Sequence, residues 1–440
     1  MLFSKKQIYQ LMIPLMVEQL LTITVGIADS MMVSVAGETA VSGVSLVDSL
    51  NNLILSILTA LATGGAVVSS QYIGRRDEKS ACQAAGQLLF TTIVLALGVS
   101  ALMLAGNEWL LRLIFGKTEE DVMSQAVTYF MIIVLTYPFM AIYNSAAALF
   151  RSMGNSKISM QVSFVMNLIN IAGNAILIFG MKWGVAGAAV ATLFSRIVGS
   201  LFLLVRIHNP RYPLHVSELR HLRPQGRMIR RILSIGIPGG MENGMFQLGK
   251  ILVLSLVSSY GTASIMANSV ASNLSMFMII PGTAVSLALI TVVGQCIGAD
   301  EIGQARTYTK NLIWASTWMI GVVSALIILL RPFLLDIYHM SDAAYEMSWT
   351  LLMWHAVFGT LLWPLSFNLP NTLRAGNDAA FTMGISMVSM WVFRVGGSYL
   401  LGHYFQLYGV WIAMFIDWGV RITCFVIRYR GEKWHSKALI

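Results

Sequence analysis

Five acidic side chains lie in stretches of this sequence that are otherwise apolar: Glu18, Asp29, Asp48, Glu242 and Asp417. A charge inside a bilayer is costly, so such residues usually mark the pathway of an ion or a substrate. Glu18 and Asp29 are eleven residues apart, which places them on nearly one helix face, about 16 Å apart along the axis. Two acids on one helix face are typical of successive binding sites for a cation or a proton. The alternative is that each is a buried, hydrogen-bonded acid.

Three asparagines share one face of a later apolar segment, because Asn167, Asn170 and Asn174 follow the spacing i, i+3 and i+7. Their amide oxygens can coordinate a hard cation or orient a carboxylate. Asparagines also hold membrane helices together, which is the structural alternative. Asn144, which follows Pro138, is a weaker candidate of the same type. Asp29, Glu18, Asn170, Asn174 and Asn144 are therefore each candidates for ion coupling, and their types and spacing leave open which of them form one site.

The second half of the chain carries a different set of charges in apolar segments, for which we predict a substrate-binding or gating role. These residues are Glu242, Lys250, Arg394 and Asp417. Asp417 and Arg421 are four residues apart on one helix and can neutralise each other. Arg394 could also pair with Asp417 across neighbouring helices. We favour a structural or gating ion pair there over a contact with substrate.

The elements that position these residues are membrane-spanning helices. The chain has 440 residues, 56% hydrophobic and 11% charged, whereas soluble domains are about 25% charged. This composition excludes a water-soluble enzyme. The net charge of +9 is explained by the basic bias of cytoplasmic loops rather than by a nucleic-acid partner. We find no metal-ligand spacing, no nucleophile motif and no Walker-type glycine loop, and therefore predict no catalytic residue, no metal site and no enzyme.

The hydropathy pattern predicts an all-α polytopic membrane protein with twelve transmembrane helices. The predicted spans are 7–33, 43–69, 85–105, 125–150, 158–179, 185–206, 232–258, 265–292, 309–329, 346–372, 380–402 and 409–428. Of the 29 Lys and Arg residues, 21 fall in segments on the N-terminal side of the membrane and four in the opposite loops. This bias predicts that both termini are cytoplasmic.

The two halves of the chain repeat each other. Ile13-Pro14 followed by Glu18 recurs, at an offset of 224 in the numbering, as Ile237-Pro238 followed by Glu242. Gln71-Tyr-Ile-Gly recurs as Gln295-Cys-Ile-Gly at the same offset, and Arg151-Ser-Met-Gly-Asn is echoed by Arg374-Ala-Gly-Asn. The chain is therefore predicted to be two pseudo-symmetric six-helix bundles in a parallel repeat, an arrangement that favours a transporter over a channel.

The repeat divides the chain into four predicted regions and also shows where the halves differ. The regions are an N-terminal bundle (1–206), a basic cytoplasmic linker (207–231), a C-terminal bundle (232–428) and a basic cytoplasmic tail (429–440). At offsets of 224 to 225, Asp29 corresponds to Val253, and Asn170 and Asn174 fall near Val395 and Tyr399. The acid and amide cluster therefore belongs to the first bundle alone.

Several motifs, in their order and spacing, resemble the MATE (multidrug and toxic compound extrusion) transporters over essentially the whole chain. They are Pro14-Leu-Met-Val-Glu-Gln-Leu-Leu, Gly26-Ile-Ala-Asp-Ser-Met-Met-Val, Ala36-Gly-Glu-Thr-Ala-Val, Gln71-Tyr-Ile-Gly, Arg151-Ser-Met-Gly-Asn, Asn170-Ile-Ala-Gly-Asn, Trp183-Gly-Val-Ala-Gly-Ala-Ala-Val-Ala-Thr and Tyr408-Gly-Val-Trp-Ile-Ala. The resemblance implies an antiporter that expels organic cations against Na⁺ or H⁺. It also implies a coupling site in which Asp29 joins Asn170 and Asn174, with Asn144 as a neighbour.

One departure from the family pattern concerns the second bundle. Many members use acids in the seventh and tenth helices, but Glu242 lies earlier than the usual acid of the seventh, and no acid occurs between Trp349 and Thr372. We therefore do not expect an ion site of that type in the second bundle.

The leading hypothesis is a cation-coupled (Na⁺ or H⁺) antiporter that exports amphipathic, mostly cationic small molecules by alternating access. One acid beside two neutral amides favours Na⁺ slightly, since a proton needs only the carboxylate. The alternatives are a flippase for a lipid-linked precursor, which would need a strongly basic cavity, and, less favoured, an ion channel. We expect no cofactor besides the coupling ion. The expected partners are organic cations and membrane lipid, and we expect a monomer in the plasma (inner) membrane.

Overall fold

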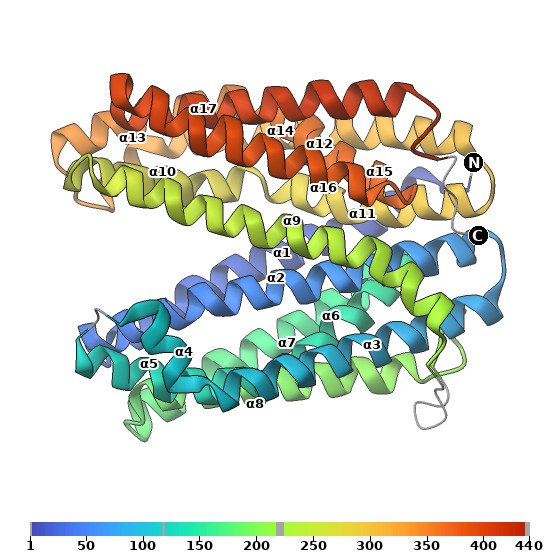
Figure 1. The fold of residues 1–440 in the computed structure, drawn as a ribbon, viewed down its shortest axis with the longest axis horizontal. Helices are drawn as coiled ribbons and strands as arrows, with labels where there is room; N and C mark the ends of the chain where they lie inside the picture. Colours follow the sequence, from blue (N-terminus) through green and yellow to red (C-terminus); the bar gives the residue numbers. More distant parts are fainter. Residues whose placement is uncertain (1, 117–118, 217–223, 436–440) are drawn as a thin grey trace. The chain divides into compact units, whose positions relative to one another are not determined.

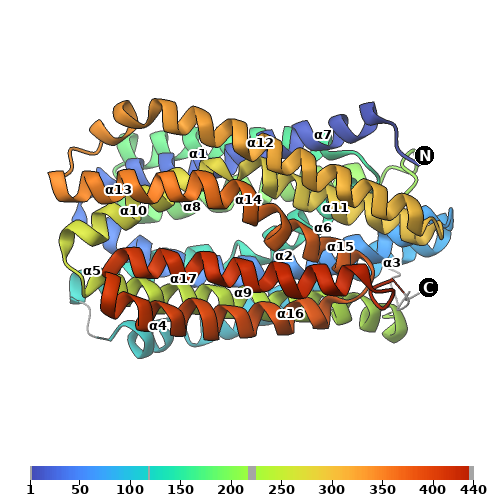
Figure 2. The same ribbon diagram turned by 90° about the horizontal axis from the view of Figure 1, so that it is seen from above.

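The computed structural model describes residues 2–116, 119–216 and 224–435, in which all regular structure is helical. The chain divides into an N-terminal unit, Lys5–Gly240, and a C-terminal unit, Met241–Ile440 together with Met1–Ser4. Within each unit the helices run side by side, roughly parallel or antiparallel (Figures 1 and 2). Parts of the predicted linker (217–223) and of the predicted tail (436–440) lie outside the described residues.

The N-terminal unit contains eight α-helices, one π-helical segment and the beginning of a ninth α-helix in the described residues. They are α1 (Lys5–Ser34), α2 (Glu38–Gly74), α3 (Glu78–Ala105), α4 (Asn107–Phe115), α5 (Glu120–Val134), α6 (Tyr137–Ser152), α7 (Ser156–Asn174), η1 (Ala175–Gly180), α8 (Gly184–Ile207) and the first part of α9 (Gly226–Ser258). Helix α7 packs against both α1 and α8, and α2 packs against α5 and α6. Helices α1, α7 and α8 carry most of the polar residues that the sequence singles out.

The C-terminal unit continues from the second part of α9. Its further elements are α10 (Thr262–Met278), α11 (Ile280–Gly298), α12 (Ile302–Asp336), α13 (Asp342–Trp354), η3 (His355–Gly359), α14 (Thr360–Trp363), η4 (Pro364–Asn368), α15 (Leu369–Ala375), α16 (Ala379–Val388), η5 (Ser389–Gly396) and α17 (Gly397–Arg430). Helix α17 packs against η5 and η4. After α17 the chain folds back, and Trp434 is fully buried and stacks on Tyr429 with ring centroids 5.4 Å apart.

The predicted spans all fall on helices. Nine helical segments of the described chain are long and apolar enough to cross a membrane, and the bent pair of α5 and α6 is a tenth candidate. The span predicted at 232–258 falls on α9. The segment Ala379–Arg430 contains the last two predicted spans, separated at Gln406, where the backbone leaves the helical conformation (φ 49°, ψ −130°). The prediction of an all-α polytopic membrane protein is therefore confirmed.

The helices are less regular than the hydropathy pattern predicts. The span predicted at 125–150 is broken between α5 and α6, whose axes differ in direction by 48°. Pro138 lies in the first turn of α6, where its missing N–H leaves no helical hydrogen bond unmade. The short helix α4 corresponds to no predicted span, because its nine residues are too few to cross a bilayer.

The duplication extends to the backbone turns. Three pairs of residues in the left-handed region are related by the repeat offset of 224: Gly37 and Gly261 (φ 107° and 94°), Arg76 and Asp300 (61° and 59°), and Lys182 and Gln406 (58° and 49°). Residues other than glycine rarely adopt this conformation. Its recurrence at corresponding turns shows that the two halves share one backbone plan, as the sequence repeat predicts.

Helix α9 belongs partly to each unit. Its first part, up to Gly240, packs with the N-terminal unit, whereas the predicted C-terminal bundle begins at residue 232. Two glycines allow α2 and α9 to approach closely: a Cβ on Gly64 would lie 2.5 Å from the Ile232 carbonyl oxygen, and one on Gly236 would lie 3.0 Å from Leu61 Cα. Small residues at such crossings let membrane helices pack backbone to backbone.

We predict opposite effects for two Gly→Ala substitutions in this unit. Gly64→Ala places a methyl group against backbone atoms that cannot move freely, so we expect a loss of about 1–3 kcal/mol from overpacking. Gly98→Ala on α3 meets no atom within 4 Å and should be neutral or stabilising by about 0.5–1 kcal/mol, because alanine favours a helix. Thermal unfolding of the purified protein measures both. Equal melting temperatures for the two variants would contradict the close crossing.

Candidate ion-coupling site

Asp29 is the centre of a polar cluster in the N-terminal unit. It lies on α1, is half-buried, and accepts a hydrogen bond from Asn174 Nδ2 on α7 (2.6 Å). This bond fixes the orientation of the Asn174 amide, because only its NH₂ group can donate to a carboxylate. Asp29 has no ion-pair partner within 4.0 Å among the residues that the structure describes. Its direct contact is therefore with an amide dipole rather than with a cation.

The two asparagines of α7 supply neutral oxygens beside this carboxylate. Asn170 donates to Thr192 Oγ1 on α8 (3.1 Å), and its Oδ1 receives a long bond from Asn174 (3.4 Å). Asn174 is buried, and its Oδ1 has no hydrogen-bond partner in the described part of the chain. A buried polar oxygen without a partner is unusual and calls for an explanation, such as an ion or a proton carrier. The structure thus brings Asp29, Asn170 and Asn174 together, as predicted.

Helix α7 changes its geometry directly after this cluster. The α-helical hydrogen bonds end at Asn174, and the π-helical segment η1 follows from Ala175 to Gly180. Such π-helical turns are rare and frequently occur at functional sites. The cluster therefore lies at a point where the helix departs from regular geometry.

A second group of charges near Asp29 was not assigned to the site from the sequence. Asp48 on α2 accepts a hydrogen bond from Tyr129 on α5 (3.4 Å), and Arg196 on α8 donates to Thr136 (2.6 Å). Both Asp48 and Arg196 are near enough to act electrostatically on Asp29. With two carboxylates and one guanidinium, the region has a formal charge of −1, which suits a cation. The signal in the sequence was the position of both residues inside apolar spans.

Two other predicted residues lie apart from the Asp29 cluster. Asn144 on α6 donates to Thr59 on α2 (3.2 Å), and no hydrogen bond joins it to Asp29 within the described ranges. The role of Asn144 as a neighbour of the coupling site therefore stays a prediction. Asn167 is half-buried and its Nδ2 has no partner in the described chain.

Glu18 shares a face with Asp29, as predicted, since both acids contact α7. Its carboxylate accepts a hydrogen bond from Ser159 Oγ (2.9 Å) and lies 3.5 Å from Arg151 Nη1. Arg151 neutralises the charge of Glu18. Asp29 has no corresponding ion pair in the described chain. The ion-coupling role of Glu18 stays a prediction, and the ion pair argues for the structural alternative.

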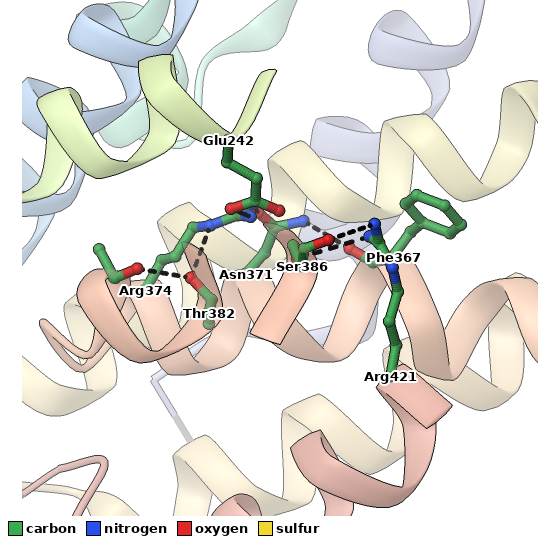
Figure 3. Close-up of polar contacts among 8 residues, drawn as sticks. Glu242, Phe367, Asn371, Arg374, Thr382, Ser386 and Arg421 are labelled. Carbon is green, nitrogen blue, oxygen red and sulfur yellow. Dashed lines mark hydrogen bonds and ion pairs between the residues drawn. The ribbon is translucent and has the colours of Figure 1, made fainter. Parts of the chain in front are cut away.

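The C-terminal unit repeats this ion pair at the corresponding positions. Glu242 on α9 accepts a hydrogen bond from Arg374 Nη2 (2.6 Å), while Arg374 also donates to Asn371 (2.8 Å) and Thr382 (3.3 Å). Figure 3 shows Arg374 between these partners. Glu242 corresponds to Glu18 in the internal repeat, and Arg374 begins the motif that echoes the one beginning at Arg151. Each unit thus anchors the first helix of its bundle to an Arg-containing motif through one buried pair.

A separate group of cations in the C-terminal unit surrounds Phe246. Asp417 is fully buried and pairs with Arg421 (3.0 Å) as the i, i+4 spacing predicts. The expected pair between Arg394 and Asp417 is absent, because the described residues give Arg394 no ion pair within 4.0 Å. Arg394 lies instead over the Phe246 ring at 5.4 Å, and Lys250 lies 5.1 Å from the same ring centroid. The register of η5 against α17 decides this partner choice, and the sequence does not reveal that register.

We predict that the Glu242–Arg374 pair is required for stable folding. Arg374→Met leaves a largely buried carboxylate without its cation, which typically costs about 3–5 kcal/mol. The double variant Glu242→Met/Arg374→Met should recover a large part of that loss. Size-exclusion chromatography after heating measures the folded fraction. Arg112→Met, which removes an exposed pair with Glu108, is the control and should change little. Additive losses in the double variant would contradict the pairing.

Comparison with known proteins places this architecture in a family. The MatE family model matches residues 14–176 and 238–400, one match in each half. The probable multidrug resistance protein NorM of Thermotoga maritima is 26% identical over 454 residues, covering 99% of this chain and 94% of that protein.

Solved structures show the same fold. An outward-facing multidrug resistance MATE family transporter of the MOP superfamily superimposes with a TM-score of 0.91 at 23% identity, covering 98% of this chain and 97% of that one. A MOP superfamily transporter from Pyrococcus furiosus, described as having a binding pocket of reverse polarity that suggests a different function, gives 0.88 at 23% identity, covering 97% and 95%. Because the family model matches both halves over most of their length, the chain belongs to the MatE family of multidrug efflux transporters, with twelve membrane helices in two bundles.

Proposed function

We propose that the chain is a cation-coupled antiporter that exports amphipathic small molecules by alternating access. The observation that carries the proposal is the unpaired Asp29 carboxylate beside the buried, unpartnered Asn174 oxygen. A buried acid without a cation partner costs free energy unless a cation or a proton occupies the site. An inward ion gradient acting on this site supplies the driving force for export. The family resemblance makes amphipathic organic cations the first substrates to test.

The coupling ion is either Na⁺ or H⁺, and the ligands at the site favour one of them. Na⁺ is a hard cation that takes oxygen ligands, and Asp29, Asn174 and Asn170 offer one anionic oxygen donor and two neutral ones. A proton would bind the carboxylate alone and leave the amides as orienting groups. The Oδ1 of Asn174, which has no partner in the described chain, would supply a further neutral oxygen ligand to such a cation. We therefore propose Na⁺ over H⁺.

The setting of the transporter belongs to the same proposal. The excess of Lys and Arg in the segments on one side of the membrane supports a protein with both termini in the cytoplasm. The chain then acts in the plasma membrane, as a monomer, and the coupling ion is the only species besides substrate that it needs to bind.

Removing the charge of Asp29 should abolish coupled efflux. In proteoliposomes with Na⁺ and pH gradients imposed separately, we expect Asp29→Asn to reduce gradient-driven export of a fluorescent organic cation to the rate of protein-free liposomes. The isosteric amide keeps the size of the side chain, so folding should be preserved. Glu108→Gln, which makes the same change of acid to amide in an exposed pair on α4, is the control and should retain export. Normal export by well-folded Asp29→Asn would refute the coupling role of this residue.

Substitution of Asn174 tests the identity of the ion. Asn174→Ala removes one neutral oxygen but keeps the carboxylate, so we expect the Na⁺ concentration for half-maximal efflux to rise about tenfold, the equivalent of one charge-assisted contact. Binding of the dye should change much less. Efflux driven equally well by a pH gradient without Na⁺, and unaffected by Asn174→Ala, would show that Asp29 binds a proton.

A second candidate function is the movement of an anionic lipid-linked precursor. The observation that favours it is the group of cations around Phe246 in the C-terminal unit. A flippase of this kind needs basic residues where the precursor phosphate binds.

A further inference from the structure

Three cationic side chains of the C-terminal unit converge on one aromatic ring. Lys250 Nζ lies 5.1 Å from the Phe246 ring centroid, and the guanidinium carbons of Arg394 and Arg421 each lie 5.4 Å from it. Lys250 and Phe246 come from α9, Arg394 from η5 and Arg421 from α17. The ring attracts each cation, but the cations repel one another. Their approach therefore needs negative charge nearby.

One of the three cations already has its counterion. Arg421 donates to Asp417 Oδ1 (3.0 Å) and to the carbonyl oxygen of Ser386 (3.2 Å), and Figure 3 shows its guanidinium directed at Ser386. Asp417 also accepts from Ser389 Oγ. Asp417 and Arg421 therefore form a pair with no net charge, in which Asp417 Oδ2 is buried without a hydrogen-bond partner among the described residues.

Lys250 and Arg394 are left with two positive charges and no acid. Within the residues that the structure describes, neither side chain has an ion pair within 4.0 Å or a hydrogen bond, and both lie over the ring. The acid that acts electrostatically on Arg394 is Asp417, which is already paired with Arg421. Glu242, the other acid of α9, is held by Arg374. Lys250 is exposed and Arg394 half-exposed on the surface of the unit, so a ligand can reach both. Two unpaired cations in an apolar segment are costly, and an anionic group between them would offset that cost.

The internal repeat provides an independent comparison. At an offset of 224, Lys250 corresponds to Gly26, and Arg394 is next to Val395, the residue near which Asn170 falls. At 225, Asp417 and Arg421 correspond to Thr192 and Arg196. The cations of the C-terminal unit thus stand where the N-terminal unit has the neighbourhood of Asp29, a region with a formal charge of −1. Position 253, which corresponds to Asp29, is valine. The corresponding regions of the two units therefore have net charges of opposite sign. The region in the N-terminal unit suits a cation, and the region in the C-terminal unit suits an anion.

We infer that Lys250 and Arg394 form a binding site for the carboxylate or phosphate group of the transported molecule, with Phe246 packing against its apolar part. This inference rests on the proposed export function and narrows its substrate class. The substrates are amphiphiles that carry an anionic group, such as zwitterions with an amine and a carboxylate. Arg394 can engage such a group with two parallel hydrogen bonds, and Lys250 acts as a point charge.

A pair of dyes tests this inference directly. Tetramethylrhodamine with a free carboxylate and its methyl ester have the same fluorophore and differ by one negative charge. Fluorescence anisotropy with the purified full-length protein in detergent gives both dissociation constants. We expect the carboxylate form to bind about tenfold more tightly, the effect of one charge-assisted contact.

Matched variants assign that preference to the two residues. Lys250→Gln and Arg394→Gln should each reduce the preference for the carboxylate form, without weakening the binding of the ester. Lys250→Arg and Arg394→Lys should retain part of the preference. Lys310→Gln on α12 and Arg430→Gln at the end of α17, both exposed, are the controls and should behave as wild type. Equal affinity of wild type for the two dyes, or a preference that persists in both Gln variants, would overturn the anion site.

A displacement experiment identifies the source of the anion, and an efflux experiment distinguishes failure of the anion site from failure of the antiporter. Displacement of the carboxylate dye by a polyprenyl phosphate in the same micelles supports a lipid-linked substrate, and failure to displace it supports a soluble amphiphile. Efflux of both dyes at equal rates by wild type and the Gln variants would retain the antiporter and overturn the site. A charge preference lost in the Gln variants, with no efflux under any gradient, would retain the site and overturn the antiporter.

Discussion

The cost of placing an ionised group in a bilayer governs the arrangement of this protein. Each charge in an apolar helix must find a partner, a dipole or a ligand. Three of the acids satisfy this requirement with an arginine of the same unit: Glu18 with Arg151, Glu242 with Arg374, and Asp417 with Arg421. Asp29 of the N-terminal unit has no ion-pair partner in the described chain. The same holds for Lys250 and Arg394 of the C-terminal unit. Two of the three pairs join different helices and the third lies within α17, so the paired charges support the fold. The unpaired charges are the ones that a transported ion or substrate can neutralise.

The duplication separates these two classes of residue. Glu18 and Glu242 keep their arginine partners in corresponding motifs of the two halves, so the pair belongs to the plan that both halves inherited. Asp29, by contrast, is replaced by valine, and Asn170 falls near Val395, which is next to Arg394. Positions that agree between the halves carry the fold. Positions that differ make the two units chemically unlike, which the proposed exchange of an ion for a substrate requires, because the two ligands must interact differently with the protein.

The fold was predictable because the hydropathy pattern and the internal repeat can both be read directly from the sequence. The partners of individual side chains were only partly predictable. Asp29 and Asn174 could be joined because the family resemblance places a first-helix acid beside the polar residues of the fifth helix. The Glu18–Arg151 pair was missed, although both residues belong to motifs that recur together. The contacts of Asp48, Arg196 and Arg394 depend on how each helix is rotated about its axis. That rotation is decided by tertiary packing and by breaks such as the one at Leu135–Thr136, neither of which a hydropathy pattern contains.

The helix geometry at the two unpaired sites indicates how binding can be linked to movement. In the N-terminal unit, η1 begins directly after Asn174, and in the C-terminal unit η5 contains Arg394. A π-helical turn widens the helix and shifts the register of the side chains that follow it. A ligand that favours the π-helical or the α-helical form of such a turn shifts the equilibrium by its difference in affinity for the two forms, and by no more. Because both units place this turn at the site where charge is unbalanced, occupation of either site can reorient the remainder of the same helix.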